Sequence, residues 1–211
     1  TSSPKAKIPG ATHMEFHEVN GVTLAKEIIK LAIDNYQNRS QKVSIPDITS
    51  DLIAGFSHEY IRYMLGGRFR ESLRPLNDAI IDGRIQGIVA IVGCNNARVG
   101  HDKSNNYLVK EFIKRDYLVV QTGCGALASA KCGILTPEAM ELAGDGLRSI
   151  CEAVGIPPIL HLGSCVDNSR ILTIASDIVK EGGLGEDLSD LPAAGIAPEW
   201  MSEKALSIGA Y

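Results

Sequence analysis

The chain has 211 residues, of which 45% are hydrophobic and 22% charged, and this composition excludes a disordered or collagen-like protein. The formal net charge of −4 reflects 21 Lys and Arg against 25 Asp and Glu, so there is no basic excess that would favour nucleic-acid binding. No apolar run approaches the roughly 18 residues that a transmembrane segment needs, and no signal-peptide pattern follows Thr1.

The first segment of the chain, residues 1–21, is polar and contains Pro9 and Gly10, so we expect an N-terminal arm or loop. Residues 22–211 are expected to form a single α/β domain. Its first element is a helix over residues 23–36, where apolar residues recur at helical spacing.

Short apolar runs bounded by turn residues predict strands, because continuous runs are typical of strands buried on both faces of a parallel sheet. These runs are residues 52–56, 85–92, 117–120, 159–162 and, more weakly, 191–196. Helical patterns lie between and after them, at 57–64, at 105–114, from Thr136, from Asp167 or Asn168 to before Gly182, and at 199–208. The alternation predicts a Rossmann-like α/β fold, with a doubly wound, mostly parallel sheet and flanking helices.

Three of the five cysteines, Cys94, Cys124 and Cys165, follow predicted strands and precede predicted helix starts. Because the carboxyl ends of parallel strands meet at one edge of a sheet, we expect these thiols to share that edge. Helix N-termini favour anionic thiolates there, and soft thiolates suit iron–sulfur clusters or soft metals. The spacing alone also allows three small hydrophobic residues at crowded strand ends.

The remaining cysteines, Cys132 and Cys151, are expected to be small buried hydrophobic residues. An odd number of cysteines without a secretion signal does not predict a disulfide framework, so we expect a reducing cytoplasm.

A competing motif overlaps the second cysteine. Residues 123–128, Gly-Cys-Gly-Ala-Leu-Ala, match the G-x-G-x-x-A pattern of dinucleotide-binding domains. The acidic residue expected about 20 residues later is missing, since Asp167 lies much further along the chain. A dinucleotide-binding oxidoreductase domain is therefore a weaker alternative.

Three motifs resemble those of nickel–iron carbon monoxide dehydrogenases: Gly93-Cys94-Asn95-Asn96, Thr122-Gly123-Cys124 and the stretch from His161 to Arg170, HLGSCVDNSR. The resemblance covers essentially the whole chain, from the KIPGATH segment that begins at Lys7 to the APEWMSEKA segment that ends at Ala205.

This family oxidises CO with water to CO2, two protons and two electrons, on a Ni–Fe–S cluster held by five Cys and one His. The resemblance implies that Cys94 and Cys124 bind irons of the cluster and that Cys165 binds nickel. It also implies that Lys204 interacts with bound CO2 or hydroxide and assists proton transfer, and that Ile208 is an apolar residue over the nickel site.

In that family the remaining histidine and two cysteine ligands come from a region before the position of Thr1, and the chains continue past Tyr211. The resemblance therefore implies that this sequence is a fragment, which alone lacks the complete cluster and is inactive. Its expected partners are the rest of the polypeptide, a second copy in a homodimer and a redox electron carrier in an anaerobic cytoplasm. A cluster-free α/β scaffold module is the alternative.

Polar residues near the cysteine segments are expected to have structural roles. His101 and His161 are expected to be surface or packed histidines, with a proton path as the alternative for His101. Asp167 and Asn168 are expected to cap a helix.

Overall fold

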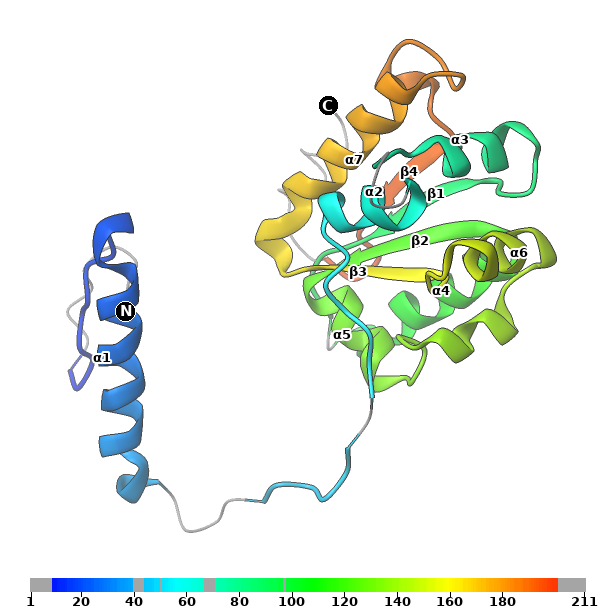
Figure 1. The fold of residues 1–211 in the computed structure, drawn as a ribbon. Coiled ribbons are helices and arrows are strands. Elements are labelled where there is room, and N and C mark those ends of the chain that lie inside the picture. Colours follow the sequence, from blue (N-terminus) through cyan, green and yellow to red (C-terminus); the bar gives the residue numbers. More distant parts are fainter. Residues whose placement is uncertain (1–8, 40–43, 50, 67–70, 97, 201–211) are drawn as a thin grey trace. The chain divides into compact units, whose positions relative to one another are not determined.

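A computed structural model describes residues 9–39, 44–49, 51–66, 71–96 and 98–200 (Figure 1). The chain forms two compact units, Thr1–Ile48 and Thr49–Tyr211, whereas the sequence predicted a boundary after residue 21. The helix predicted over 23–36 is present as α1 (Gly21–Asp34), but it belongs to the first unit. Only Leu24 of α1 is buried, and every described residue of the hydrophobic core lies in the second unit, which explains the different boundary.

The second unit is built on a parallel sheet with the strand order β3-β2-β1-β4. This arrangement confirms the predicted α/β fold with a parallel sheet. Its elements are, in chain order, α2 (His58–Gly66), α3 (Arg74–Ile81), β1 (Gly87–Ile91), α4 (Lys103–Lys114), β2 (Tyr117–Thr122), α5 (Gly123–Lys131), α6 (Asp145–Val154), β3 (Ile159–Gly163), α7 (Asn168–Glu181) and β4 (Ala193–Ile196).

The order of the strands reverses at β1. The chain first moves outward from β1 to β2 and β3, and α7 then carries it back so that β4 pairs with the other side of β1. Figure 1 shows α2, α3 and α7 on one side of the sheet and α4 and α5 on the other. In such sheets, ligands bind beyond the carboxyl ends of the strands near the reversal, which here lies between β1 and β4.

Four of the five predicted strands are present, and the prediction for residues 52–56 is wrong. That segment runs beside β3 without forming a strand, because the N–H groups of Gly55 and Phe56 both donate to the carbonyl of His161, each at 3.1 Å. Gly55 has a φ of +93°, which an extended strand does not allow. The apolar run is nevertheless explained, because Phe56 is buried in the core.

The helix predictions are largely confirmed. At the start of α2, the hydroxyl of Ser57 accepts a hydrogen bond from the N–H of Tyr60 at 3.2 Å. The start signal at Thr136 is correct, but the element that follows is a 3₁₀ helix, Pro137–Leu142. The helix predicted over 199–208 lies mostly outside the described residues, which end at Trp200. The sequence did not predict α3.

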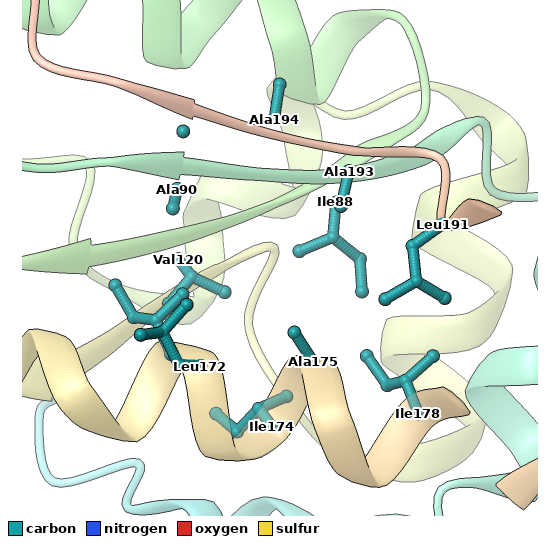
Figure 2. Close-up of a pocket in the computed structure, with 12 residues that line it drawn as sticks. Ile88, Ala90, Val120, Leu172, Ile174, Ala175, Ile178, Leu191, Ala193 and Ala194 are labelled. Carbon is teal, nitrogen blue, oxygen red and sulfur yellow. The ribbon is translucent and has the colours of Figure 1, made fainter. Parts of the chain in front are cut away.

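An apolar cavity of about 210 Å³ lies between α7 and the β1 and β4 side of the sheet. Figure 2 shows aliphatic side chains of α7, among them Ile174 and Ile178, facing Ile88 and Val120 on the strands. The described residues that line this cavity are all apolar. Among the described residues, no helix is both long and apolar enough to cross a membrane.

Candidate metal centre

The three predicted cysteine ligands lie at the carboxyl edge of three neighbouring strands. Cys94 follows β1, Cys124 is in the first turn of α5 directly after β2, and Cys165 starts a short 3₁₀ helix, Cys165–Asp167, after β3. All three thiols are exposed and none forms a disulfide. The structure therefore places the three sequence-predicted ligands on one edge, each available to a ligand that approaches from beyond the sheet.

The turns that carry Cys124 and Cys165 are packed directly against each other. Gly123 has a φ of +55°, and a Cβ atom at this position would lie 3.3 Å from both the Cβ and the backbone nitrogen of Cys165. The hydroxyl of Thr122 donates a hydrogen bond to the side-chain oxygen of Asn168, and this bond also joins the two turns. A glycine is thus needed at position 123 both for its backbone conformation and for space.

The turn of Cys165 is held by the carboxylate of Asp167. Its Oδ2 accepts hydrogen bonds from the N–H and the hydroxyl of Ser164, at 2.8 and 3.1 Å, and its Oδ1 accepts one from Nε of Arg170 at 3.1 Å. Arg170 and then Ser164 lower the pKa of Asp167, which favours the ionised carboxylate. Asp167 thus occupies the predicted N-cap position of α7, but its carboxylate makes no side-chain capping bond to that helix and belongs to the capping box of the 3₁₀ helix with Ser164.

Arg170 also connects this turn to α2. Its Nη1 lies 3.2 Å from Oε2 of Glu59 and 3.1 Å from Nδ1 of His58. The guanidinium is about one-third exposed, so these contacts help to orient the Cys165 turn against α2 more than they add to the stability of the fold.

A polar network that the sequence did not predict surrounds the loop after Cys94. The carboxylate of Asp102 binds the side-chain amide of Asn95 and the ammonium of Lys131, and it lies 3.2 Å from Nε2 of His101. Asp102 has a φ of +68°, a conformation that turns the chain into α4. His101 is therefore a surface histidine held beside the Cys94 loop. The contact between Asp102 and Lys131 had no signal in the local sequence, because Lys131 lies at the end of α5 and Asp102 directly before α4.

A second group that the sequence did not single out is Glu199, which follows β4 at the same edge. Its side chain is only 2% exposed, yet its carboxylate is fully hydrogen-bonded to backbone N–H groups of the Cys94 loop and α4. The one available signal was an acidic residue placed directly after an apolar run, at the strand end that faces the cysteines.

The other two cysteines differ from each other. Cys151 is buried in α6, as predicted, and burial followed by the charge of Glu152 raises the pKa of its thiol to about 12. Cys132 is exposed at the end of α5, so the prediction that it is buried is wrong. The reason is its C-cap position, where the chain leaves the helix through Gly133 toward the surface.

His161 is partly buried, and its Nε2 lies 2.9 Å from the carbonyl oxygen of Gly163. It is therefore a packed histidine within β3, as predicted. The predicted catalytic residues Lys204 and Ile208 lie outside the described residues.

The thiols at this edge fit a cluster of several metal atoms better than a single metal ion. Within the described part of the chain, no three His, Cys, Asp or Glu side chains lie close enough together to hold one metal ion. A cluster of several metal atoms places its thiolate ligands on different atoms, so its cysteines need not converge on one point. Three exposed thiols on neighbouring strand ends match that requirement as part of a ligand set.

A model of the Prismane/CO dehydrogenase family matches residues 1–211. Carbon monoxide dehydrogenase 1 of Methanosarcina acetivorans is 56% identical over 212 residues, which cover 100% of this chain and 33% of that protein. Carbon monoxide dehydrogenase 1 of Carboxydothermus hydrogenoformans is 44% identical over 222 residues, which cover 100% of this chain and 35% of that protein. The chain thus spans about a third of the length of these curated relatives.

Solved structures give the same picture. A nickel-free carbon monoxide dehydrogenase from Thermococcus sp. AM4 superposes with a TM-score of 0.85 at 54% identity, over 100% of this chain and 32% of that chain. Carbon monoxide dehydrogenase IV from Carboxydothermus hydrogenoformans gives a TM-score of 0.84 at 45% identity, over 97% of this chain and 34% of that chain.

Proposed function

The chain belongs to the Prismane/CO dehydrogenase family, and we propose that it forms the α/β part of a nickel–iron carbon monoxide dehydrogenase that carries three cysteine ligands of the active cluster. The full enzyme would catalyse the reaction CO + H2O → CO2 + 2 H⁺ + 2 e⁻. This chain alone, which spans about a third of its relatives, is expected to be inactive.

One observation carries the proposal. Cys94, Cys124 and Cys165 are exposed at the carboxyl edge of adjacent parallel strands, in a chain that the family model matches from end to end. Structural cysteines at a domain core are buried, as Cys151 is, whereas these three thiols face the side of the sheet where ligands bind. This arrangement also argues against the cluster-free scaffold as the better interpretation.

The residues of this chain would hold the cluster and assist proton transfer. Cys94 and Cys124 would bind irons and Cys165 nickel, because soft thiolates are the preferred ligands of both metals in such sites. When bound, the cluster supplies the metal chemistry that takes up the two electrons of CO oxidation. The ammonium of Lys204 would stabilise the carboxylate that develops from CO and exchange a proton with it, while Ile208 would keep the place above the nickel apolar.

The rest of the enzyme would come from the remaining polypeptide, which supplies one histidine and two further cysteine ligands. As in the family, we propose a homodimer that passes electrons to a redox carrier in an anaerobic cytoplasm. A reducing compartment is consistent with the five cysteines, none of which forms a disulfide.

The test uses the full-length polypeptide, produced anaerobically with nickel and iron. We expect CO-dependent reduction of methyl viologen, and we expect a Cys165→Ala variant to lose it with its nickel. Cys132→Ala is the matched control, since Cys132 is exposed but lies away from the strand ends and has no assigned ligand role. Full activity of Cys165→Ala would contradict the assignment of Cys165.

A further inference from the structure

Glu199 is a buried acidic side chain whose two oxygens are used entirely by the backbone of another segment. Its side chain is 2% exposed. The carboxylate accepts N–H hydrogen bonds at Oε2 from Asn96 and Asp102, both at 3.1 Å, and at Oε1 from Ser104 and Asn105, at 2.9 and 3.1 Å. Burial raises the pKa of Glu199, but the four N–H bonds together outweigh burial and hold the pKa below its usual value. The carboxylate is therefore ionised at neutral pH.

Glu199 acts as the N-terminal cap of α4 from a distant part of the chain. The cap residue Asp102 makes no side-chain capping bond of its own, since its carboxylate binds Asn95 and Lys131 instead. The first N–H groups of a helix have no partners within the helix, and a carboxylate at that end also interacts favourably with the helix dipole. Bonds of this kind, with an ionised acceptor, are among the stronger hydrogen bonds in proteins.

The segment that carries Glu199 is also attached to both sides of Cys94. Before the cysteine, the N–H of Val92 donates to the carbonyl of Ile196 at 2.9 Å. A Cβ atom on Gly93 would lie 3.3 Å from the Cβ atoms of both Ala197 and Trp200. After the cysteine, the N–H of Asn96 is held by Glu199. The loop of Cys94 is therefore fixed at both ends by the last residue of β4 and the residues that follow it.

The same contacts extend to the turn of Cys124. Asn105, whose N–H binds Glu199, is fully buried beside Gly125. A Cβ atom on Gly125 would lie 3.7 Å from Oδ1 of Asn105 and 3.0 Å from the carbonyl oxygen of Ile91. The first turn of α4 thus lies beside the Cys124 turn, and Glu199 ties this part of α4 to the Cys94 loop.

We propose that Glu199 is a positioning residue of the cluster site, which fixes the Cys94 loop and the first turn of α4 against the segment that leads to Lys204. The inference rests on the proposed function, because its effect on catalysis requires that Cys94 is a cluster ligand. Glu199 precedes Lys204 by five residues in the sequence, so it anchors the chain between a ligand and the proposed catalytic lysine.

The decisive variant is Glu199→Gln in the full-length enzyme. The amide keeps the size of the side chain, but its NH2 group faces two backbone N–H donors, so half of the bonds are lost. We expect kcat for CO oxidation to fall between about 10-fold and 100-fold, the range in which small displacements affect a preorganised site. We also expect faster amide hydrogen exchange over residues 92–106, and an altered electron paramagnetic resonance signal of the cluster.

Glu181→Gln is the matched control. Its carboxylate also joins two elements, through the N–H of Leu73 at 3.1 Å and the hydroxyl of Ser72 at 2.7 Å, but it lies at the opposite end of α7 from Cys165. We expect this variant to exchange faster around residues 72–73 while its kcat and cluster signal stay those of the wild type.

A kcat of Glu199→Gln within about twofold of the wild type, or unchanged exchange over residues 92–106, would overturn the proposal. If Glu199→Gln does not fold, Glu199→Asp takes its place. Its shorter carboxylate keeps the charge but cannot reach both pairs of N–H groups. We therefore expect kcat to fall about 3-fold to 10-fold, and a kcat equal to that of the wild type would contradict the proposal. A wild-type enzyme that does not oxidise CO would instead refute the proposed function, and hydrogen exchange alone would then decide whether Glu199 holds the loop.

Discussion

Gly123 is the residue at which two of the proposed ligand turns meet. Its φ of +55° is unfavourable for any residue with a side chain, and an added Cβ would lie 3.3 Å from Cys165. For Gly123→Ala we expect a loss of about 1–2 kcal/mol in the free energy of unfolding from the left-handed conformation. We also expect the displaced Cys165 to lower the nickel content of the full-length enzyme.

Gly133→Ala separates these two effects. Gly133 has a φ of +73°, but an added Cβ would meet no atom within 4 Å. The control should therefore show a similar loss of stability in a urea titration and a normal nickel content. Equal nickel loss in both variants would contradict the idea that contact with Cys165 matters.

The thiols themselves provide a second prediction. Burial raises the pKa of Cys151 to about 12, so this residue has almost no thiolate at pH 8, whereas Cys94, Cys124, Cys132 and Cys165 are exposed. In the metal-free folded chain, iodoacetamide should modify the exposed cysteines and leave Cys151 unmodified until urea is added. Peptide mass spectrometry would measure this, and rapid labelling of Cys151 without urea would contradict the described burial.

At the scale of single residues, the sequence predicted the thiols but not their supports. Cys94, Cys124 and Cys165 each follow an apolar run, and the local sequence pattern is enough to detect such a run. The contacts of Glu199 with Asn96 and Ser104 join segments about a hundred residues apart, and such pairing depends on the order of strands in the sheet. The exposure of Cys132 was likewise decided by where α5 ends.

At the scale of elements, the parallel strands were the most predictable part. The apolar runs of the central strands β1 and β2 are buried on both faces, so the sequence pattern and the burial agree there, whereas β4 is mostly exposed. The run at residues 52–56 has the same composition but lies against His161 at the edge of β3, where Gly55 prevents an extended ladder. Composition alone does not distinguish these two cases.

Asn77 provides a test of how α3 and α7 are joined. It is fully buried, and its Nδ2 donates to the carbonyls of Ile178 and Gly182, both at 2.9 Å. For Asn77→Ala we expect a loss of about 2–4 kcal/mol in the free energy of unfolding, since two hydrogen bonds are lost and the carbonyls of Ile178 and Gly182, one in a buried and one in a partly buried place, lose their partner. Denaturation by urea would measure it.

Asp78→Ala on the same helix is the control. The carboxylate of Asp78 is 45% exposed and pairs with Arg74 at 2.7 Å. An exposed ion pair of this kind contributes at most about 1 kcal/mol, so the control should lie close to the wild type. If both variants lost the same stability, the Asn77 contacts would not be what joins the two helices.

At the scale of the whole molecule, the sheet and its core belong to one unit, Thr49–Tyr211. Because none of the described residues of Thr1–Ile48 is part of that core, we expect a chain that begins at residue 49 to fold cooperatively. Its melting temperature should stay within about 4 °C of that of the 211-residue chain, which corresponds to roughly 1 kcal/mol at this size. Differential scanning calorimetry would measure this, and a shortened chain without a cooperative transition would contradict it.

The function could be inferred from the sequence only through family motifs. The thiols and the parallel sheet indicate a soft-metal site, but the identity of the metal and of the substrate depends on ligands that other parts of the polypeptide would supply. The match to about a third of each curated relative is consistent with that division.

The most direct test of the central claim is the nickel and iron content of the full-length polypeptide, purified without oxygen, with Cys94, Cys124 and Cys165 replaced together by Ala. We predict that the triple variant folds but loses its nickel and the iron of the active cluster, while a Cys132→Ala variant keeps the wild-type content. A triple variant that retained the wild-type amounts of both metals would contradict the assignment of this sheet edge to the cluster.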